Sequence, residues 1–170
     1  MEAKIKKIKL VAMDVDGVLT EGKIIVDSEG RDIKAFDVQD GFGMVLLRKA
    51  GIKTAIITAR ASQPVTFRAK GLRIDRVYQD AYPKADFYKK MLSDLDVSDD
   101  DVCYIGDDLP DLPVLKRVGF PVAVANAVDE VKDAAVYVTQ RRGGCGAVRE
   151  LIELILKTQG KWDPLMKGLE

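Results

Sequence analysis

Two aspartates separated by one residue, Asp14 and Asp16, have the spacing in this sequence that is most suited to chemistry. They follow the short apolar run of residues 9–13 and precede Gly17. Such runs, bounded by turn residues, are typical of buried strands, and parallel strands present their carboxyl ends to a ligand crevice. A carboxylate buried there is costly unless it meets a cation or a proton. The pair therefore predicts either a divalent metal ion or one ionised and one protonated carboxyl group.

Other polar residues also follow predicted strands. The set comprises Asp14 and Asp16, Thr58, Lys84, and Asp107 with Asp108 and Asp111. In a parallel sheet these strand ends share one edge, and together the side chains predict a phosphate site with a magnesium ion. Taken alone, Thr58 is more typical of a helix N-cap and Lys84 of a solvated surface charge. The prediction therefore depends on the order and spacing of the whole set.

The elements that would position these residues alternate along the chain. Strands are predicted over residues 8–13, 53–58, 77–79, 102–105, 122–124 and 135–138. Helices are predicted over residues 41–49, with Asp40 as N-cap, and over 62–70, 83–95, 112–118, 128–132 and 146–157. Alternation of this kind predicts an α/β fold, a parallel sheet with helices on both faces. We expect a single domain over residues 1–170, with a β-hairpin at about residues 22–37 inserted after the first strand.

Composition narrows the function classes. The 170 residues contain 27 Lys and Arg, 27 Asp and Glu, and no histidine. Without an excess of positive charge we expect no binding to nucleic acid or to a membrane surface, and no apolar run is long enough for a membrane span. The charged start of the chain lacks a signal peptide, which favours the cytoplasm. The lack of histidine excludes Ser-His and Cys-His triads and histidine-bound zinc.

Four short motifs in this order resemble those of the haloacid dehalogenase (HAD) phosphatase superfamily. They are Asp14-x-Asp16-Gly17-Val18-Leu19-Thr20, Thr58, Lys84 and Gly106-Asp107-Asp108-x-x-Asp111. Further segments resemble a HAD family that hydrolyses 3-deoxy-D-manno-octulosonate 8-phosphate (KDO 8-phosphate), at residues 36–41, 57–60, 78–79 and 143–150. The resemblance covers nearly the whole chain and implies a Rossmann-like HAD fold with no cap domain. A local departure is Ala59, where many relatives have glycine.

The resemblance implies a magnesium-dependent phosphatase that works through an aspartyl phosphate, in lipopolysaccharide precursor synthesis. Asp14 would be the nucleophile, and Asp16 the general acid for the leaving alkoxide and then the base for water. Thr58 and Lys84 would hold the phosphoryl group. The implied Mg²⁺ ligands are Asp14, Asp16 through its backbone carbonyl, and Asp107, with Asp108 and Asp111 behind them.

The resemblance also implies where the sugar phosphate binds. The implied substrate contacts are Asp16, Asp37, Val38, Gln39, Asp40, Gly41, Arg60, Arg68 and Lys84. Arg60 and Arg68 are eight residues apart, so an intervening helix could keep both near the sugar carboxylate, which arginine binds well. Arg68 could instead belong to a solvated basic helix face.

Two further expectations concern assembly. An isolated hairpin is only marginally stable, and in the resembled family such hairpins associate into a barrel, so we expect a homotetramer. The tail at about residues 160–170 carries the only tryptophan, Trp162. We expect this tail to dock, either on its own subunit or on a neighbour whose active site it would close.

Three alternatives remain open at this stage. The chain could act on a related nine-carbon sugar acid phosphate. It could be a non-enzymatic phosphoacceptor module, since receiver domains also use acidic residues, Thr, Lys and magnesium. It could finally be a paralogue with an inactive site, although the complete motifs argue against this.

Overall fold

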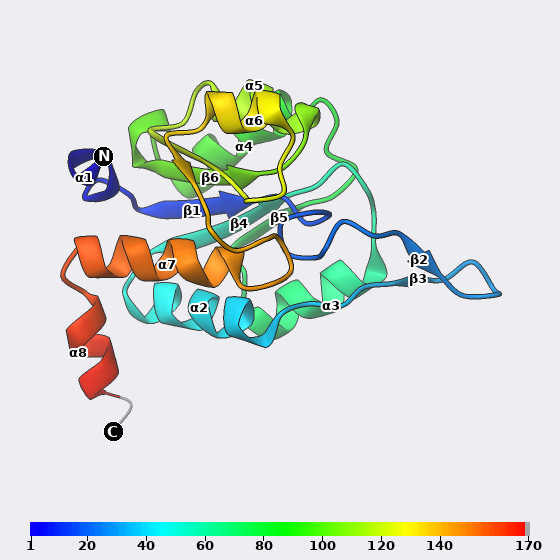
Figure 1. Cartoon of the computed structure of the whole chain (residues 1–170), viewed down its shortest axis with the longest axis horizontal. Helices are drawn as coiled ribbons and strands as arrows, with labels where there is room; N and C mark the ends of the chain where they lie inside the picture. The colour runs from blue at the N-terminus through cyan, green and yellow to red at the C-terminus, as the bar shows by residue number, and fades with distance from the viewer. Residues whose placement is uncertain (169–170) are drawn as a thin grey trace.

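A six-stranded parallel sheet forms the centre of the molecule in the computed structural model, which describes residues 1–168 (Figure 1). The strands are β1 (Leu10–Met13), β4 (Lys53–Ile57), β5 (Arg76–Tyr78), β6 (Val102–Gly106), β7 (Phe120–Ala123) and β8 (Tyr137–Val138), in the order β5-β4-β1-β6-β7-β8. Every pairing is parallel, and β1 pairs with β4 on one side and β6 on the other. The predicted parallel sheet is confirmed.

Helices cover both faces of the sheet, as predicted. The helices are α1 (Glu2–Ile5), α2 (Val38–Lys49), α3 (Gln63–Leu72), α4 (Lys84–Leu95), α5 (Leu112–Leu115), α6 (Asp129–Ala134), α7 (Ala147–Thr158) and α8 (Trp162–Lys167). Figure 1 shows α4, α5 and α6 on one face of the sheet, and α2, α3 and α7 on the other. All four residues of β1 and all five of β6 are buried, because central parallel strands are covered on both sides. The site is therefore built at the ends of two fully buried central strands.

The predicted hairpin is confirmed, with strands shorter than expected. Strands β2 (Ile25–Val26) and β3 (Asp32–Ile33) pair antiparallel in a sheet of their own. The hairpin projects from one end of the molecule (Figure 1). Ile25, Val26 and Ile33 are 45%, 58% and 48% exposed. Much of the apolar surface of this two-stranded ribbon is therefore left uncovered by the rest of residues 1–168.

The start of α2 differs from the prediction. Its N-cap is Asp37 rather than Asp40, because the Asp37 carboxylate accepts hydrogen bonds from the backbone N–H groups of Gln39 and Asp40. Asp40 lies in the first helical turn and is buried. Both aspartates suit an N-cap, and the tertiary contacts of Asp40 described below decide between them.

Two short α-helices were not predicted, and one predicted helix is shorter. Helix α8 follows α7 after Gly160 and packs against it, and α1 precedes the first strand. Helix α5 ends at Leu115 rather than Val118. The predicted tail extends to Glu170, and its last two residues lie outside the described part of the chain. Within residues 1–168, no helix combines the length and apolar character that crossing a membrane requires.

Candidate active site

Asp14 and Asp16 lie directly after β1, the strand between β4 and β6. The loop that follows turns sharply at Gly17, whose φ is +95°. A Cβ at position 17 would collide with the carboxylate of Asp107. Glycine is therefore required both for the left-handed backbone and for the close approach of Asp107. Pairing of β1 with β6 places their ends side by side, and this turn lets the loop after β1 pack closely against Asp107.

A buried lysine joins the two strand ends. Nζ of Lys84 lies 2.9 Å from Oδ2 of Asp14 and 2.6 Å from Oδ1 of Asp111. The Lys84 side chain is 1% exposed, so the alternative of a solvated surface lysine is wrong. Lys84 is the first residue of α4. The predicted convergence of these strand ends is thus present in the structure.

Asp111 organises the base of the site. Its Oδ1 accepts hydrogen bonds from Lys84 and from the Tyr104 hydroxyl at 2.7 Å. Its Oδ2 accepts the backbone N–H groups of Asp107 at 2.9 Å and Asp108 at 3.3 Å. With both oxygens engaged, Asp111 orients its neighbours and has no oxygen free for a metal ion. Sequence reasoning missed Tyr104, which looks like an ordinary apolar strand residue.

The close approach of several buried carboxylates shifts the pKa values of the groups in the site. Burial, opposed by Lys84, raises the pKa of Asp14 to about 6. Burial together with the charges of Asp14 and Asp111 raises the pKa of Asp107 to about 8. Burial alone would lower the pKa of Lys84, but the two carboxylates beside it raise that pKa. Carboxylates at such short range need an added cation to be ionised together.

The donor set fits a hard divalent cation. Carboxylate oxygens of Asp14, Asp107 and Asp111 lie within 4.8 Å of one another. Oδ1 of Asp107 is buried without a hydrogen-bond partner among residues 1–168, which is costly unless a cation satisfies it. Because Asp111 is already engaged, Asp14 and Asp107 are the carboxylates placed to bind. An all-oxygen set of this kind suits Mg²⁺.

A cavity of about 230 Å³ opens over these carboxylates. Its lining includes Asp14, Asp16, Thr58, Arg60, Lys84, Asp107 and Asp108. Thr58 is 2% exposed, and its backbone N–H and carbonyl are held by Tyr78 and Ala81, so its position is fixed by the adjoining strand. One cavity therefore gathers these predicted catalytic and metal-binding residues, with Asp111 supporting them from below.

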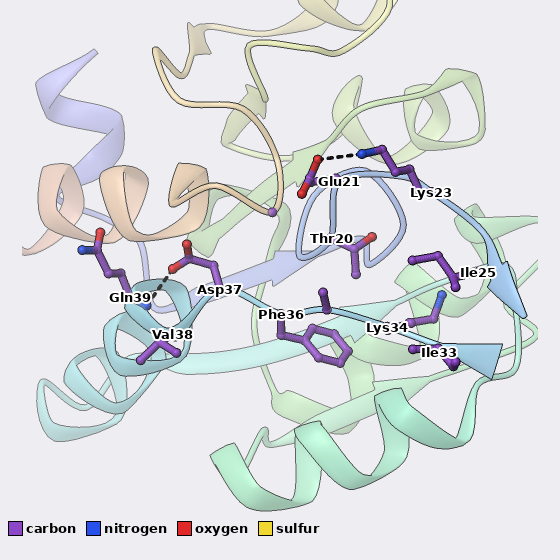
Figure 2. A pocket seen from close by; sticks show the side chains of 12 residues that line it. Thr20, Glu21, Lys23, Ile25, Ile33, Lys34, Phe36, Asp37, Val38 and Gln39 are labelled. Atoms are coloured by element: carbon purple, nitrogen blue, oxygen red, sulfur yellow. Dashed lines mark hydrogen bonds and ion pairs between the residues drawn. The ribbon is translucent and has the colours of Figure 1, made fainter. Parts of the chain in front are cut away.

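A second cavity, of about 570 Å³, lies beside the hairpin stem (Figure 2). Figure 2 shows Phe36, Asp37, Val38 and Gln39 on one side of it and Thr20 on the other. The side chains of Val38 and Gln39 are exposed, whereas the Asp37 carboxylate is committed to capping α2. Residues 37–39 of the predicted substrate segment therefore border this second cavity and not the cavity over the carboxylates.

The other predicted substrate residues are placed differently. Asp40 is 1% exposed and accepts the backbone N–H of Arg149 at 2.6 Å, so it joins α2 to α7 and lines neither cavity. Gly41 is buried, and a Cβ there would collide with the Arg68 guanidinium. Arg68 donates a hydrogen bond to the backbone carbonyl of Asp37 at 3.4 Å.

The two arginines lie on different parts of the chain's structure. Arg60 lies before the first residue of α3, Gln63, and lines the smaller cavity. Arg68 lies within α3, with its guanidinium 5.9 Å from the centre of the Phe36 ring. One helix does not join them, because α3 begins at Gln63, with Ser62 as its N-cap, three residues after Arg60.

Lys34 is a residue of the site that sequence reasoning missed. It follows β3, lines the larger cavity, and forms an ion pair with Asp16. The signal in the sequence is weak, because a lysine near a hairpin strand is usually a solvated charge. Only the fold of the hairpin against the loop after β1 brings Lys34 to Asp16.

Comparisons with known proteins agree with this geometry. The family model of the haloacid dehalogenase-like hydrolases matches residues 57–151. A curated protein of Escherichia coli strain K12, 3-deoxy-D-manno-octulosonate 8-phosphate phosphatase KdsC, is 42% identical over 95% of this chain and 86% of its own length. The protein of the same name from Yersinia pestis is 44% identical over 91% of this chain and 82% of its own length.

A solved structure gives the same result at the level of the fold. The 3-deoxy-D-manno-octulosonate 8-phosphate phosphatase of Moraxella catarrhalis, in complex with a magnesium ion, a phosphate ion and a KDO molecule, superposes with a TM-score of 0.96. It is 43% identical, and the superposition covers 99% of this chain and 97% of that one.

Proposed function

This chain belongs to the haloacid dehalogenase-like hydrolases and, within them, to the KDO 8-phosphate phosphatase family, and we propose that it hydrolyses KDO 8-phosphate to KDO and inorganic phosphate. As a family member it is a phosphoric monoester hydrolase, which sets aside a non-enzymatic phosphoacceptor. The observation that carries the proposal is the cavity that gathers Asp14, Asp16, Thr58 and Lys84 at the ends of adjacent strands.

The proposed reaction proceeds in two balanced steps. The Asp14 carboxylate attacks phosphorus, the bond between phosphorus and the sugar oxygen breaks, and Asp16 gives its proton to the leaving alkoxide. A water molecule then attacks phosphorus of the aspartyl phosphate and gives a proton to Asp16. The bond between phosphorus and the carboxylate oxygen breaks, which releases phosphate and regenerates Asp14.

Lys84 and Thr58 would bind the phosphoryl oxygens that do not react, where charge is spread in the transition state. Mg²⁺ would be held by Asp14, by Asp107 and by the backbone carbonyl of Asp16, with Asp108 and Asp111 supporting these ligands. When bound, the ion supplies positive charge that offsets the carboxylates and the phosphoryl group. Arg60 is placed in the same cavity and would bind the sugar carboxylate.

The substrate segment at residues 37–41 and Arg68 remain proposals for this chain. Val38 and Gln39 border the larger cavity and are the members of this segment that could reach a sugar in a single subunit. Asp40, Gly41 and Arg68 would not contact the sugar. They would fix the position of the backbone that carries Val38 and Gln39.

We also propose that the enzyme is a homotetramer that works in the cytoplasm, in lipopolysaccharide precursor synthesis. Support for the assembly comes from the apolar hairpin side chains exposed in the single chain. Association of hairpins would cover this surface and pair the open edges of β2 and β3.

A substrate panel tests the proposal. Phosphate release is measured with Mg²⁺ on KDO 8-phosphate, a nine-carbon sugar acid phosphate, a hexose phosphate and p-nitrophenyl phosphate. We expect the highest kcat/KM on KDO 8-phosphate. A higher value on the nine-carbon compound would favour the alternative substrate, and no turnover of any of them would contradict the function.

A further inference from the structure

The lysine on the hairpin side of the site, Lys34, contacts the proposed general acid. Its ammonium pairs with Oδ1 of Asp16, although the two residues are 18 positions apart in the sequence. The Lys34 side chain is 2% exposed and that of Asp16 is 19% exposed. Lysine is almost never buried to this degree unless it is paired. The burial of Lys34 is therefore explained by its ion pairing.

Lys34 is the one hydrogen-bond donor to the Asp16 carboxylate within residues 1–168. Asp14, by comparison, is held both by Lys84 and by the backbone N–H of Val15. An aspartate side chain can rotate about two bonds, so a carboxyl group with a single tether takes its orientation from that tether. The direction in which Asp16 points thus depends on Lys34.

The ammonium of Lys34 is itself anchored from the other side. Oδ2 of Asp32 lies 3.6 Å from it. Both carboxylate oxygens of Asp32 are buried and have no hydrogen-bond partner in the described part of the chain, so the attraction between this carboxylate and Lys34 is its main compensation. Lys34 is consequently fixed between Asp32 and Asp16, which is the arrangement expected of a preorganised support.

We propose that Lys34 is a positioning residue for the reaction. It holds the Asp16 carboxyl group in the orientation from which that group protonates the leaving oxygen and later accepts a proton from water. This rests on the proposed function. It gives two residues of the hairpin segment, Lys34 and its anchor Asp32, a role in positioning Asp16.

Two other roles for Lys34 give different kinetics. The residue could simply neutralise Asp32, in which case its loss would weaken folding and would affect all substrates alike. It could also contact the sugar directly, because it lines the larger cavity, and its loss would then raise KM whether or not Asp16 is present. A positioning residue acts only through Asp16.

A double-mutant cycle on two substrates separates these roles. Lys34→Met, Asp16→Asn and the double variant are assayed on KDO 8-phosphate and on p-nitrophenyl phosphate, whose leaving group needs no proton. We expect Lys34→Met to lower kcat on KDO 8-phosphate by roughly 10- to 100-fold and on p-nitrophenyl phosphate clearly less. In the Asp16→Asn background the same substitution should change kcat by less than about 2-fold.

Three further variants complete the test. Lys34→Arg keeps the charge and should recover most of the activity. Arg31→Met removes a positive charge from the same hairpin and should leave kcat unchanged, since the ion pairs that Arg31 makes among residues 1–168 are with Asp27 and Glu29. Asp32→Asn, which loosens the anchor of Lys34, should reproduce the Lys34→Met pattern more weakly, and it replaces that variant if Lys34→Met does not fold.

A full loss that persists in the Asp16→Asn background would overturn the proposal, because a positioning residue acts only through Asp16. The proposed function fails in a separate way. If Asp16→Asn alone retains wild-type turnover of KDO 8-phosphate, the assignment of the general acid is wrong, whatever Lys34 does.

Discussion

Nζ of Lys84 lies 2.9 Å from Oδ2 of Asp14, and the two side chains are 1% and 12% exposed. Burial raises the pKa of Asp14 to about 6, while the ammonium of Lys84 limits the rise. The ammonium beside Asp14 therefore favours the ionised form of this carboxylate even though it is buried. A carboxylate in this state can attack phosphorus, and the same ammonium can stay beside the phosphoryl group that arrives.

Replacing Asp14 with asparagine should abolish turnover without unfolding the protein. Asparagine keeps the shape of the side chain but cannot form an acyl phosphate. Asp16→Asn should retain some activity and lose roughly 10²- to 10⁴-fold, the usual contribution of a general acid and base. Steady-state phosphate release, with circular dichroism as the folding control, checks both variants. Release by Asp14→Asn at near the wild-type rate would refute the covalent mechanism.

Metal-free protein should lose stability as the pH rises from about 4 to 8. The pKa of Asp107 is raised from 3.8 to about 8 by burial and by the charges of Asp14 and Asp111. In this window the folded state keeps a proton that the unfolded state has released, so raising the pH favours unfolding. Mg²⁺ should reverse the trend, because binding requires the carboxylate and grows stronger as protons leave.

Thermal unfolding at about pH 5, 6, 7 and 8, in EDTA and in Mg²⁺, measures this. The gap in Tm between the two conditions should widen toward pH 8. Asp107→Asn is the control, and it should narrow the gap and flatten the pH dependence in EDTA. An Mg²⁺ effect of the same size at every pH would contradict the assignment of Asp107, and full turnover in excess EDTA would contradict a metal requirement.

Asp40 should contribute mainly to the stability of the fold. Its carboxylate accepts the backbone N–H of Arg149 at 2.6 Å and joins α2 to α7. Asp40→Ala leaves that buried donor unpaired and should cost about 1–3 kcal/mol of unfolding free energy. Urea denaturation checks this, with Val38→Ala as the control because Val38 is 80% exposed. An unchanged midpoint together with a raised KM would instead favour direct binding of substrate.

The convergence of the candidate site residues was predictable because most of them follow a strand. Asp14, Thr58 and Asp107 come directly after apolar runs, and a parallel sheet must bring such positions together. This reasoning does not give the full strand order, because local sequence patterns do not specify which strands pair with each other. The hairpin was also predictable, because its turn residues separate two β-prone runs.

Residues whose role depends on tertiary contacts were not predictable. Lys34 acquires its partner only when the hairpin packs on the loop after β1, and Tyr104 only when Asp111 folds beneath its strand. Asp37 and Asp40 are equally good N-caps by type. The choice falls to Asp37 because Asp40 is used by the N-terminus of α7, more than 100 residues later. Local patterns contain no information about such contacts.

The exposed hairpin should mediate assembly. Ile25 and Ile33 face each other across β2 and β3 and are 45% and 48% exposed. The double substitution Ile25→Glu and Ile33→Glu places charges on this surface and should convert a tetramer into smaller species. Light scattering measures the mass, and Glu29→Ala in the turn is the control. A wild-type monomer at micromolar concentration would contradict the tetramer, and a double variant that stays tetrameric would place the interface elsewhere.

The C-terminal segment should contribute to stability through its own subunit. The Trp162 ring lies 5.7 Å from the Arg149 guanidinium and 4.9 Å from the Lys157 ammonium, both on α7. Such contacts are worth about 0.5–1 kcal/mol each at exposed sites. Removal of residues 160–170 should therefore lower Tm, as expected for a tail that docks on its own subunit.

Closure of a neighbouring active site by the end of the tail remains a proposal, and kinetics can test it. An enzyme without a cap needs another way to exclude water from the aspartyl phosphate. If the tail does this, stopping the chain after Lys167, which keeps α8, should lower kcat/KM on KDO 8-phosphate more than on p-nitrophenyl phosphate. Trp162→Ala is the matched variant, because it removes the contacts with α7 and keeps the last residues. Equal effects of the truncation on both substrates would show that the tail serves only the fold.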